Sequence, residues 1–95
     1  MSTDGHSGVN DAEALAEIHR LARFGRFVMT PHARRRMVER GAKELDVRTA
    51  LQTATSAIRQ VGRDSWRVEG GVDVDGDDLT LICDIEADVI VVTLF

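Results

Sequence analysis

The hydrophobic pattern changes its period near residue 56, and this change restricts the possible folds more than any other feature of the sequence. Before that point, apolar residues recur every three or four positions, as they do along one side of an amphipathic helix. After it, short β-prone runs alternate with turn signals rich in glycine and aspartate. The four runs span residues 57–61, 65–74, 78–86 and 89–95. Because their connections are short, they predict an antiparallel meander with a hairpin turn at Asp75-Gly76.

Two helices with clear start signals are predicted before this change. The first begins at the capping pair Asn10 and Glu13 and runs for about 14 residues. The second has Thr30 as its cap and Pro31 in its first position, where a missing N–H has no consequence, and it ends at Gly41. Both signals are local, so they fix these two helix starts without any knowledge of the rest of the fold.

A third helix is predicted from about residue 43 to 56, and residues 27–30 form a short β-prone stretch between the first two helices. Apolar residues at helical spacing indicate the sides that face the core. They are Leu15, Ile18, Leu21 and Ala22 on the first helix, Ala33, Met37 and Val38 on the second, and Leu45, Ala50, Leu51 and Ala54 on the third, with Val47 beside them.

These elements predict an α+β domain of two layers, in which N-terminal helices pack on a four-stranded antiparallel meander sheet. Ninety-five residues support one small domain, which we place at residues 10–95. Residues 1–9 are polar and contain glycine, and we expect them to form a flexible tail.

The composition excludes several classes of protein. The longest apolar run, residues 89–92, is far shorter than the roughly 20 residues that cross a bilayer, and the first residues show no secretory signal. We therefore expect a cytoplasmic protein with no membrane contact. The single cysteine, Cys83, has no partner for a disulfide or a zinc site. The acidic stretch 73–78 lacks the glycine spacing of a calcium loop, so no metal or cofactor is expected.

The charges are distributed unevenly along the chain, whose net charge is -4. All 12 lysines and arginines lie between Arg20 and Arg67, together with only four acids, so this window carries a net charge of +8. The remaining acids flank it on both sides. Such a distribution favours a basic face that meets a polyanion, although a solvated, charge-balanced surface produces the same count.

His32, Arg36 and Arg40 follow each other at intervals of four along the second helix, so they lie on one side of it. His32 falls in the first turn, where free backbone N–H groups favour a bound phosphate and the helix dipole favours a neutral imidazole. A neutral histidine is a general base, and an arginine one turn away holds a phosphate through two hydrogen bonds. These residues are those that RNA cleavage requires, although no general acid is evident.

A purely structural interpretation of the same residues stays open. A lone histidine near a helix start often bonds only to backbone, and helix arginines are usually solvated; Arg35 and Glu39 are spaced to pair with each other. Trp66, the only tryptophan, either stacks on a base or, more commonly for so large a side chain, fills the core.

The second helix carries the pattern T-x-H-A-x-x-R-M-x-x-R-G, formed by Thr30, His32, Ala33, Arg36, Met37, Arg40 and Gly41. This pattern resembles that of a bacterial family of small domains of unknown function. That family is similar to the RelE and barnase-like toxin superfamily, whose better-known members are ribonucleases neutralised by an antitoxin. The resemblance covers about residues 26–95 and implies a RelE-like two-layer fold.

Two hypotheses of function follow, and the sequence leaves open whether the chain is an enzyme. The first is a toxin-like, metal-independent endoribonuclease, with His32 and Arg36 as catalytic residues and Arg40 and Arg67 on RNA phosphates. Its partners are RNA and a cognate antitoxin-like protein. The second is a noncatalytic protein- or nucleic-acid-binding module, favoured by the missing general acid and by an apolar final strand whose edge can pair with another protein. A homodimer is compatible with both.

Overall fold

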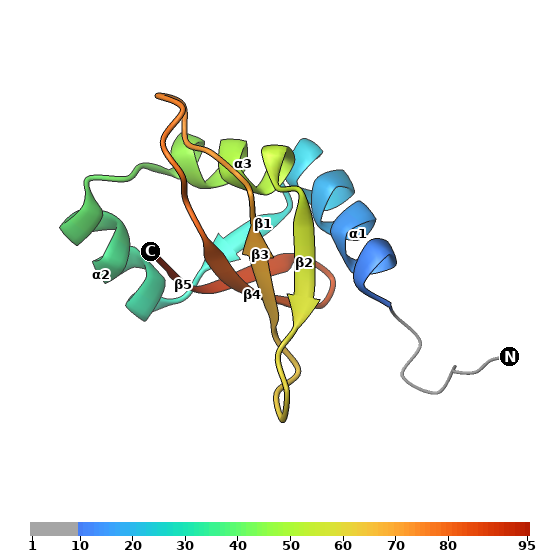
Figure 1. Ribbon diagram of the computed structural model, residues 1–95. Helices are drawn as coiled ribbons and strands as arrows, with labels where there is room; N and C mark the ends of the chain where they lie inside the picture. The colour runs from blue at the N-terminus through green and yellow to red at the C-terminus, as the bar shows by residue number, and fades with distance from the viewer. Residues whose placement is uncertain (1–9) are drawn as a thin grey trace, which may run out of the picture.

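The computed structural model describes residues 10–95, whose helices and strands form two layers (Figure 1). The predicted flexible tail, residues 1–9, lies outside the described residues. The α+β class is confirmed. In chain order the elements are α1 (Asp11–Arg23), β1 (Phe27–Met29), α2 (Pro31–Arg40), α3 (Glu44–Thr53), β2 (Ser56–Arg59), β3 (Trp66–Glu69), β4 (Leu81–Ile85) and β5 (Val89–Leu94).

The sheet has five strands in the order β1-β5-β4-β3-β2, so the predicted four-stranded antiparallel sheet is incomplete. Strands β2 to β5 form the expected meander, and β1 adds a parallel strand against β5. β1 has three residues, too few to show a strand periodicity of their own. Backbone hydrogen bonds to residues far along the chain position β1. The N–H of Val89 donates to the carbonyl of Arg26, and the N–H of Thr30 donates to the carbonyl of Val91, each at 3.0 Å.

β5 is an inner strand, paired with β4 on one side and β1 on the other. The expectation that the final strand offers a free edge to a partner protein is therefore wrong. β5 also contains one extra residue, Val92, because Ile82 of β4 pairs with Thr93 and the next residue, Cys83, pairs with Val91. This irregularity turns the carbonyl of Val92 away from β4 and toward the start of α2.

Both predicted helix starts are confirmed at the level of atoms. The side chain of Asn10 accepts from the N–H of Glu13 at 2.8 Å, and Glu13 accepts from the N–H of Asn10 at 3.1 Å. Thr30 accepts from the N–H of Ala33, and Gly41 ends α2 with a φ of 74°. α3 ends at Thr53, earlier than predicted, because the next residues turn to join the sheet.

The long predicted run 65–74 leaves the sheet at Gly70, where a hairpin begins whose bridge pairs Val72 with Asp78. Gly71 then passes directly against α3. A Cβ atom on Gly71 would lie 2.1 Å from the carbonyl oxygen of Ala50, so only glycine fits between the hairpin and the helix. The Asp75-Gly76 turn is confirmed, since Gly76 has a φ of 86° at the tip.

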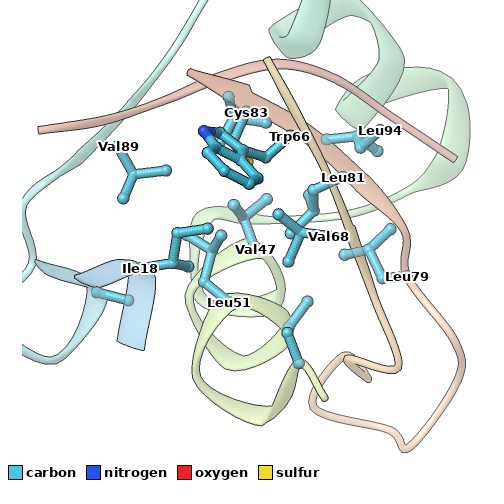
Figure 2. Close-up of a cluster of buried hydrophobic side chains, with 14 of the residues drawn as sticks. Ile18, Val47, Leu51, Trp66, Val68, Leu79, Leu81, Cys83, Val89 and Leu94 are labelled. Atoms are coloured by element: carbon cyan, nitrogen blue, oxygen red, sulfur yellow. The ribbon is translucent and has the colours of Figure 1, made fainter. Parts of the chain in front are cut away.

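The core lies between α1, α3 and one face of the sheet (Figure 2). Ile18 of α1, Leu51 of α3 and Val68 of β3 are almost fully buried there, and each contributes roughly 1.5–3 kcal/mol of hydrophobic stabilisation. Trp66 is 5% exposed and lies beside Cys83 in the same cluster. The core interpretation of Trp66 is therefore confirmed, and base stacking by its indole is excluded.

The predicted buried side of α3 is partly wrong. Leu45 is 62% exposed, whereas Val47, placed only at the flank, is fully buried. Val47, Ala50 and Leu51 form the buried side at intervals of three and four, and Leu45 falls outside it. The reason is the packing of α3 in the helix layer, which turns Val47, Ala50 and Leu51 into the core cluster.

Candidate functional site

α2 is held against β5 by the residue that caps it. The hydroxyl of Thr30 donates to the carbonyl of Val92 at 2.9 Å and accepts from the N–H of Ala33 at 3.1 Å. One side chain therefore satisfies an orphan donor of the helix and an acceptor of the strand. Pro31 follows in the first helical position, and Ala33 and Met37 form the buried side of α2. Val38, also expected there, is 82% exposed, which corrects the prediction.

His32 lies in the first turn of α2 and is exposed to solvent. Its ring makes no hydrogen bond to any of residues 10–95. The N–H groups of Ala33 and Arg34 donate to Thr30, so among the first-turn groups expected to favour an anion only the N–H of His32 is left for one. An interpretation in which His32 serves only to bond neighbouring backbone is thus not supported by its contacts. Its imidazole is accessible for chemistry with a bound molecule.

Arg36, one turn further along α2, is bonded to the chain itself. Its Nε donates to the carbonyl of Leu94 at 3.2 Å, and its Nη1 lies 2.9 Å from Oε1 of Glu39. Glu39 therefore pairs with Arg36, and the predicted pair of Arg35 with Glu39 is wrong. Arg36 lies at intermediate exposure, so part of its guanidinium still faces solvent.

Arg40 contacts the segment that leads into β4. Its Nη2 donates to the backbone carbonyl of Asp78 at 2.5 Å, which ties the end of α2 to the segment leading into β4. Gly41 follows in the left-handed conformation and closes the helix, because its N–H and that of the next residue donate to carbonyls of the last turn. Arg40 thus has a structural contact that the sequence pattern did not predict.

Arg67 comes from β3, far from α2 in sequence. It lies on the face of the sheet that α1 and α3 leave uncovered, since its neighbours Trp66 and Val68 point into the core. Its Nε pairs with Glu69, and its guanidinium carbon lies 5.1 Å from the centre of the Phe95 ring. Cation and aromatic ring stack on each other in this geometry.

The three predicted arginines therefore converge on the paired ends of β4 and β5. Arg36 contacts Leu94, Arg67 contacts Phe95, and Arg40 contacts Asp78 just before the backbone pair of Thr80 with Phe95. Figure 1 shows the end of β5 beside α2. His32 stands one turn before Arg36 and two turns before Arg40. The three arginines thus contact neighbouring segments of the chain, and His32 lies on the same helix as two of them.

Sequence reasoning missed Thr93 as a neighbour of this group. Ile82 of β4 pairs with Arg67 on one side and with Thr93 on the other, so the three side chains form one row across the open face. A strict alternation of inward and outward side chains along β5 does not predict this row, because the extra residue Val92 changes which residues share a face of the sheet. Thr93 adds a hydroxyl within the row that contains Arg67.

The acidic hairpin does not form a metal site among the described residues. The Oδ1 of Asp73 accepts from the N–H groups of Asp75 and Asp77 at 2.9 and 3.0 Å, so its carboxylate stabilises the turn. Within residues 10–95 no cluster of three histidine, cysteine or acidic side chains is arranged to hold a metal ion. None of the helices in that range is long and apolar enough to span a membrane.

The architecture defines a small α+β domain with a cation-rich end of its sheet. Residues 29–95 match the family described as Domain of unknown function (DUF4258), and the chain belongs to that family. The match begins in β1, so α1 precedes the part of the chain that the family covers, although four residues of α1 are in the core. Searches of curated proteins and of solved structures find no match.

Proposed function

We propose that the chain is a toxin-like endoribonuclease of a toxin–antitoxin pair, which cleaves RNA without a metal ion. The observation that carries the proposal is the contrast within the helix pattern. Thr30, Arg36 and Arg40 each bond to the chain itself, whereas His32 bonds to none of residues 10–95 and is exposed. The pattern resembles that of a family of small domains, and the similarity of that family to RelE and barnase-like toxins supports the same assignment.

In the proposed reaction, the imidazole of His32 takes the proton of an RNA 2′-hydroxyl. The 2′-oxygen then forms a bond to the adjacent phosphorus, and the bond from phosphorus to the 5′-oxygen breaks. The products are a 2′,3′-cyclic phosphate and a 5′-hydroxyl, whose proton comes from water. The N–H of His32 and the free N–H of Arg36 stabilise the charge that develops on the phosphate, since the N–H groups of Ala33 and Arg34 already donate to Thr30. Arg40 and Arg67 hold neighbouring phosphates.

The test is a cleavage assay on purified protein with a single-stranded RNA, in the presence of a chelator. We expect products that end in a 2′,3′-cyclic phosphate, and a loss of about 10²–10⁴-fold in rate in His32→Ala, as for removal of a general base. Arg34→Ala, on a different side of α2, is the matched control and keeps its rate. An inactive wild type whose expression also leaves growth unchanged would overturn the proposal.

A second candidate is a noncatalytic nucleic-acid-binding module. The observation that favours the absence of catalysis is that Arg36, Arg40 and Arg67 are already bonded to carbonyls, carboxylates or an aromatic ring of the chain. Binding of RNA without cleavage, equal in wild type and His32→Ala, would support it. The affinity would fall steeply with added salt if phosphates are contacted, and a flat salt dependence would contradict RNA binding altogether.

A further inference from the structure

The guanidinium of Arg36 is held by two acceptors of different kinds. Its Nε donates to the carbonyl of Leu94, and its Nη1 donates to Oε1 of Glu39 at 2.9 Å. Leu94 is fully buried in β5, so the sheet fixes its carbonyl. The carboxylate of Glu39 lies at the end of a side chain that is 61% exposed, so it is free to turn away. Of the two contacts, only the one with Glu39 is exchangeable for a bound ligand.

Together these contacts leave Arg36 without an open pair of donors. A guanidinium binds a phosphate through one of two pairs of parallel N–H groups, Nε with Nη2 or Nη1 with Nη2. In Arg36, Leu94 occupies a member of the first pair and Glu39 occupies a member of the second. Nη2 has no acceptor among residues 10–95, because Glu39 contacts the guanidinium through one oxygen only. Departure of the Glu39 carboxylate therefore opens the pair of Nη1 with Nη2.

The other two arginines of the candidate site differ in this respect. Arg67 contacts Glu69 through Nε, so its pair of Nη1 with Nη2 carries no carboxylate of residues 10–95. Arg40 donates through Nη2, the atom common to both pairs, and its acceptor is the backbone carbonyl of Asp78. Only in Arg36 does one exposed side chain decide whether a pair of donors is open.

The stability of α2 does not explain the carboxylate at position 39. Glu39 is the second-last residue of the helix, where the helix dipole disfavours a negative charge. It also follows Arg36 by three residues, whereas the order in which the acid precedes the base is the more stable one. Position 39 lies within about 20° of His32 around the helix axis. Glu39 thus stands on the side of α2 that carries the proposed catalytic residues.

We propose that Glu39 occupies the phosphate position of Arg36 in the free protein, and that a phosphodiester group of RNA displaces it. This inference rests on the proposed function, from which it takes RNA as the ligand. The phosphate presents two oxygens to Nη1 and Nη2, while the carbonyl of Leu94 keeps the guanidinium in place. Glu39 thereby contributes to specificity. An anion that makes a single contact, such as chloride, gains too little to replace the carboxylate, whereas a phosphate gains two charge-assisted hydrogen bonds.

The test measures binding apart from cleavage. The probe is a fluorescent single-stranded 2′-O-methyl RNA oligonucleotide, which lacks the attacking hydroxyl, and its anisotropy is titrated with the full-length protein at fixed salt. We expect Glu39→Ala to bind about two- to fivefold more tightly than the wild type, as for release of an exposed ion pair. Glu44→Ala removes the same charge from a pair with Arg34 and is the matched control. It should stay within about 1.5-fold of the wild type, because salt screens an exposed charge away from the bound phosphate.

A second comparison separates the open pair of donors from a general effect of charge. Lysine keeps the charge of Arg36 but has no pair of parallel donors. In the Arg36→Lys background, Glu39→Ala should therefore improve the affinity by less than about 1.5-fold. Both proteins of this comparison carry the lysine, so any loss of the Leu94 contact cancels. Urea unfolding curves establish that each variant is folded.

Equal affinity of Glu39→Ala and the wild type would overturn the proposal, and so would an equal gain in Glu44→Ala or in the Arg36→Lys background. A wild type that does not bind the probe would overturn it as well. If the wild type cleaves RNA while Glu39→Ala binds no more tightly, the role of Glu39 fails and the ribonuclease function stands. If Glu39→Ala binds more tightly and no protein cleaves RNA, the role of Glu39 stands and the ribonuclease function fails.

Discussion

The guanidinium of Arg36 donates to the backbone carbonyl of Leu94, so a side chain of α2 takes the place of a neighbouring strand at the edge of β5. β1 pairs with β5 only as far as Val91. Beyond that point Thr30 and Arg36 supply the donors, through a hydroxyl and an Nε. An arginine at this position of the helix pattern is therefore explained by the fold, whatever its part in catalysis.

Removal of this contact should destabilise the protein. In Arg36→Ala the carbonyl of Leu94 loses its donor, and we expect the free energy of unfolding to fall by about 1–3 kcal/mol. Urea unfolding followed by the fluorescence of Trp66, which is buried in the core, measures the change. Arg35→Ala, an exposed neighbour, should stay within about 0.5 kcal/mol of the wild type. Equal stability of the two variants would contradict the role of Arg36.

His32→Ala should behave in the opposite way. Because its ring is exposed and bonds to none of residues 10–95, we expect the free energy of unfolding to change by less than about 0.5 kcal/mol. The same urea experiment checks this. A loss comparable to that of Arg36→Ala would mean that His32 supports the fold, and it would remove the observation on which the proposed ribonuclease function rests.

A methyl group at Gly71 should be poorly tolerated. In Gly71→Ala the new Cβ would meet the carbonyl oxygen of Ala50 at 2.1 Å, so α3 or the hairpin must move. We expect a loss of about 2 kcal/mol or more, as for overpacking in a core. Gly62→Ala is the matched control: its φ is 76° but nothing lies within 4 Å, so its loss comes from the backbone alone, about 1 kcal/mol. Thermal unfolding ranks the two.

The thiol of Cys83 should react only after unfolding. Burial raises the pKa of this thiol, and the nearby carboxylate of Asp84 adds to the shift, so the native side chain stays protonated in mild alkali. At about pH 9 an exposed cysteine is mostly thiolate and reacts readily with a thiol reagent. We expect the native protein to react at its slow rate of unfolding, and the urea-unfolded protein to react at once. Rapid labelling of the native protein would show that β4 opens locally.

Local signals in the sequence predicted the starts of the helices well. The caps at Asn10 and Thr30 and the stop at Gly41 involve only near neighbours, and the structure confirms all three. Long-range features escaped prediction. The rotation of α3, which buries Val47 and exposes Leu45, depends on the packing of the whole helix layer. Sequence periodicity alone does not resolve it.

For the candidate site, too, the sequence predicted the local arrangement but not the long-range contacts. Spacing placed His32, Arg36 and Arg40 on one side of a helix, and the structure agrees. The spacing did not predict that Arg36 and Arg40 bond to carbonyls of distant segments, because those acceptors are backbone atoms that every residue carries. Nor did it link Arg67 to Phe95, a contact that requires the extra residue in β5 and the order of the strands.

The parallel pairing of β1 with β5 also bears on the order in which the chain folds. Arg26 forms an ion pair with Asp88 at this junction, and the contacting residues are separated by 62 positions. A ribosome has to synthesise nearly the whole domain before this pairing can form, and contacts so distant in sequence slow the search for the native state. Until then β4 has no strand on the side that β5 occupies in the complete sheet, and the apolar face of β1 is exposed to water. During synthesis, the chain therefore passes through a stage that is vulnerable to aggregation and to capture by chaperones.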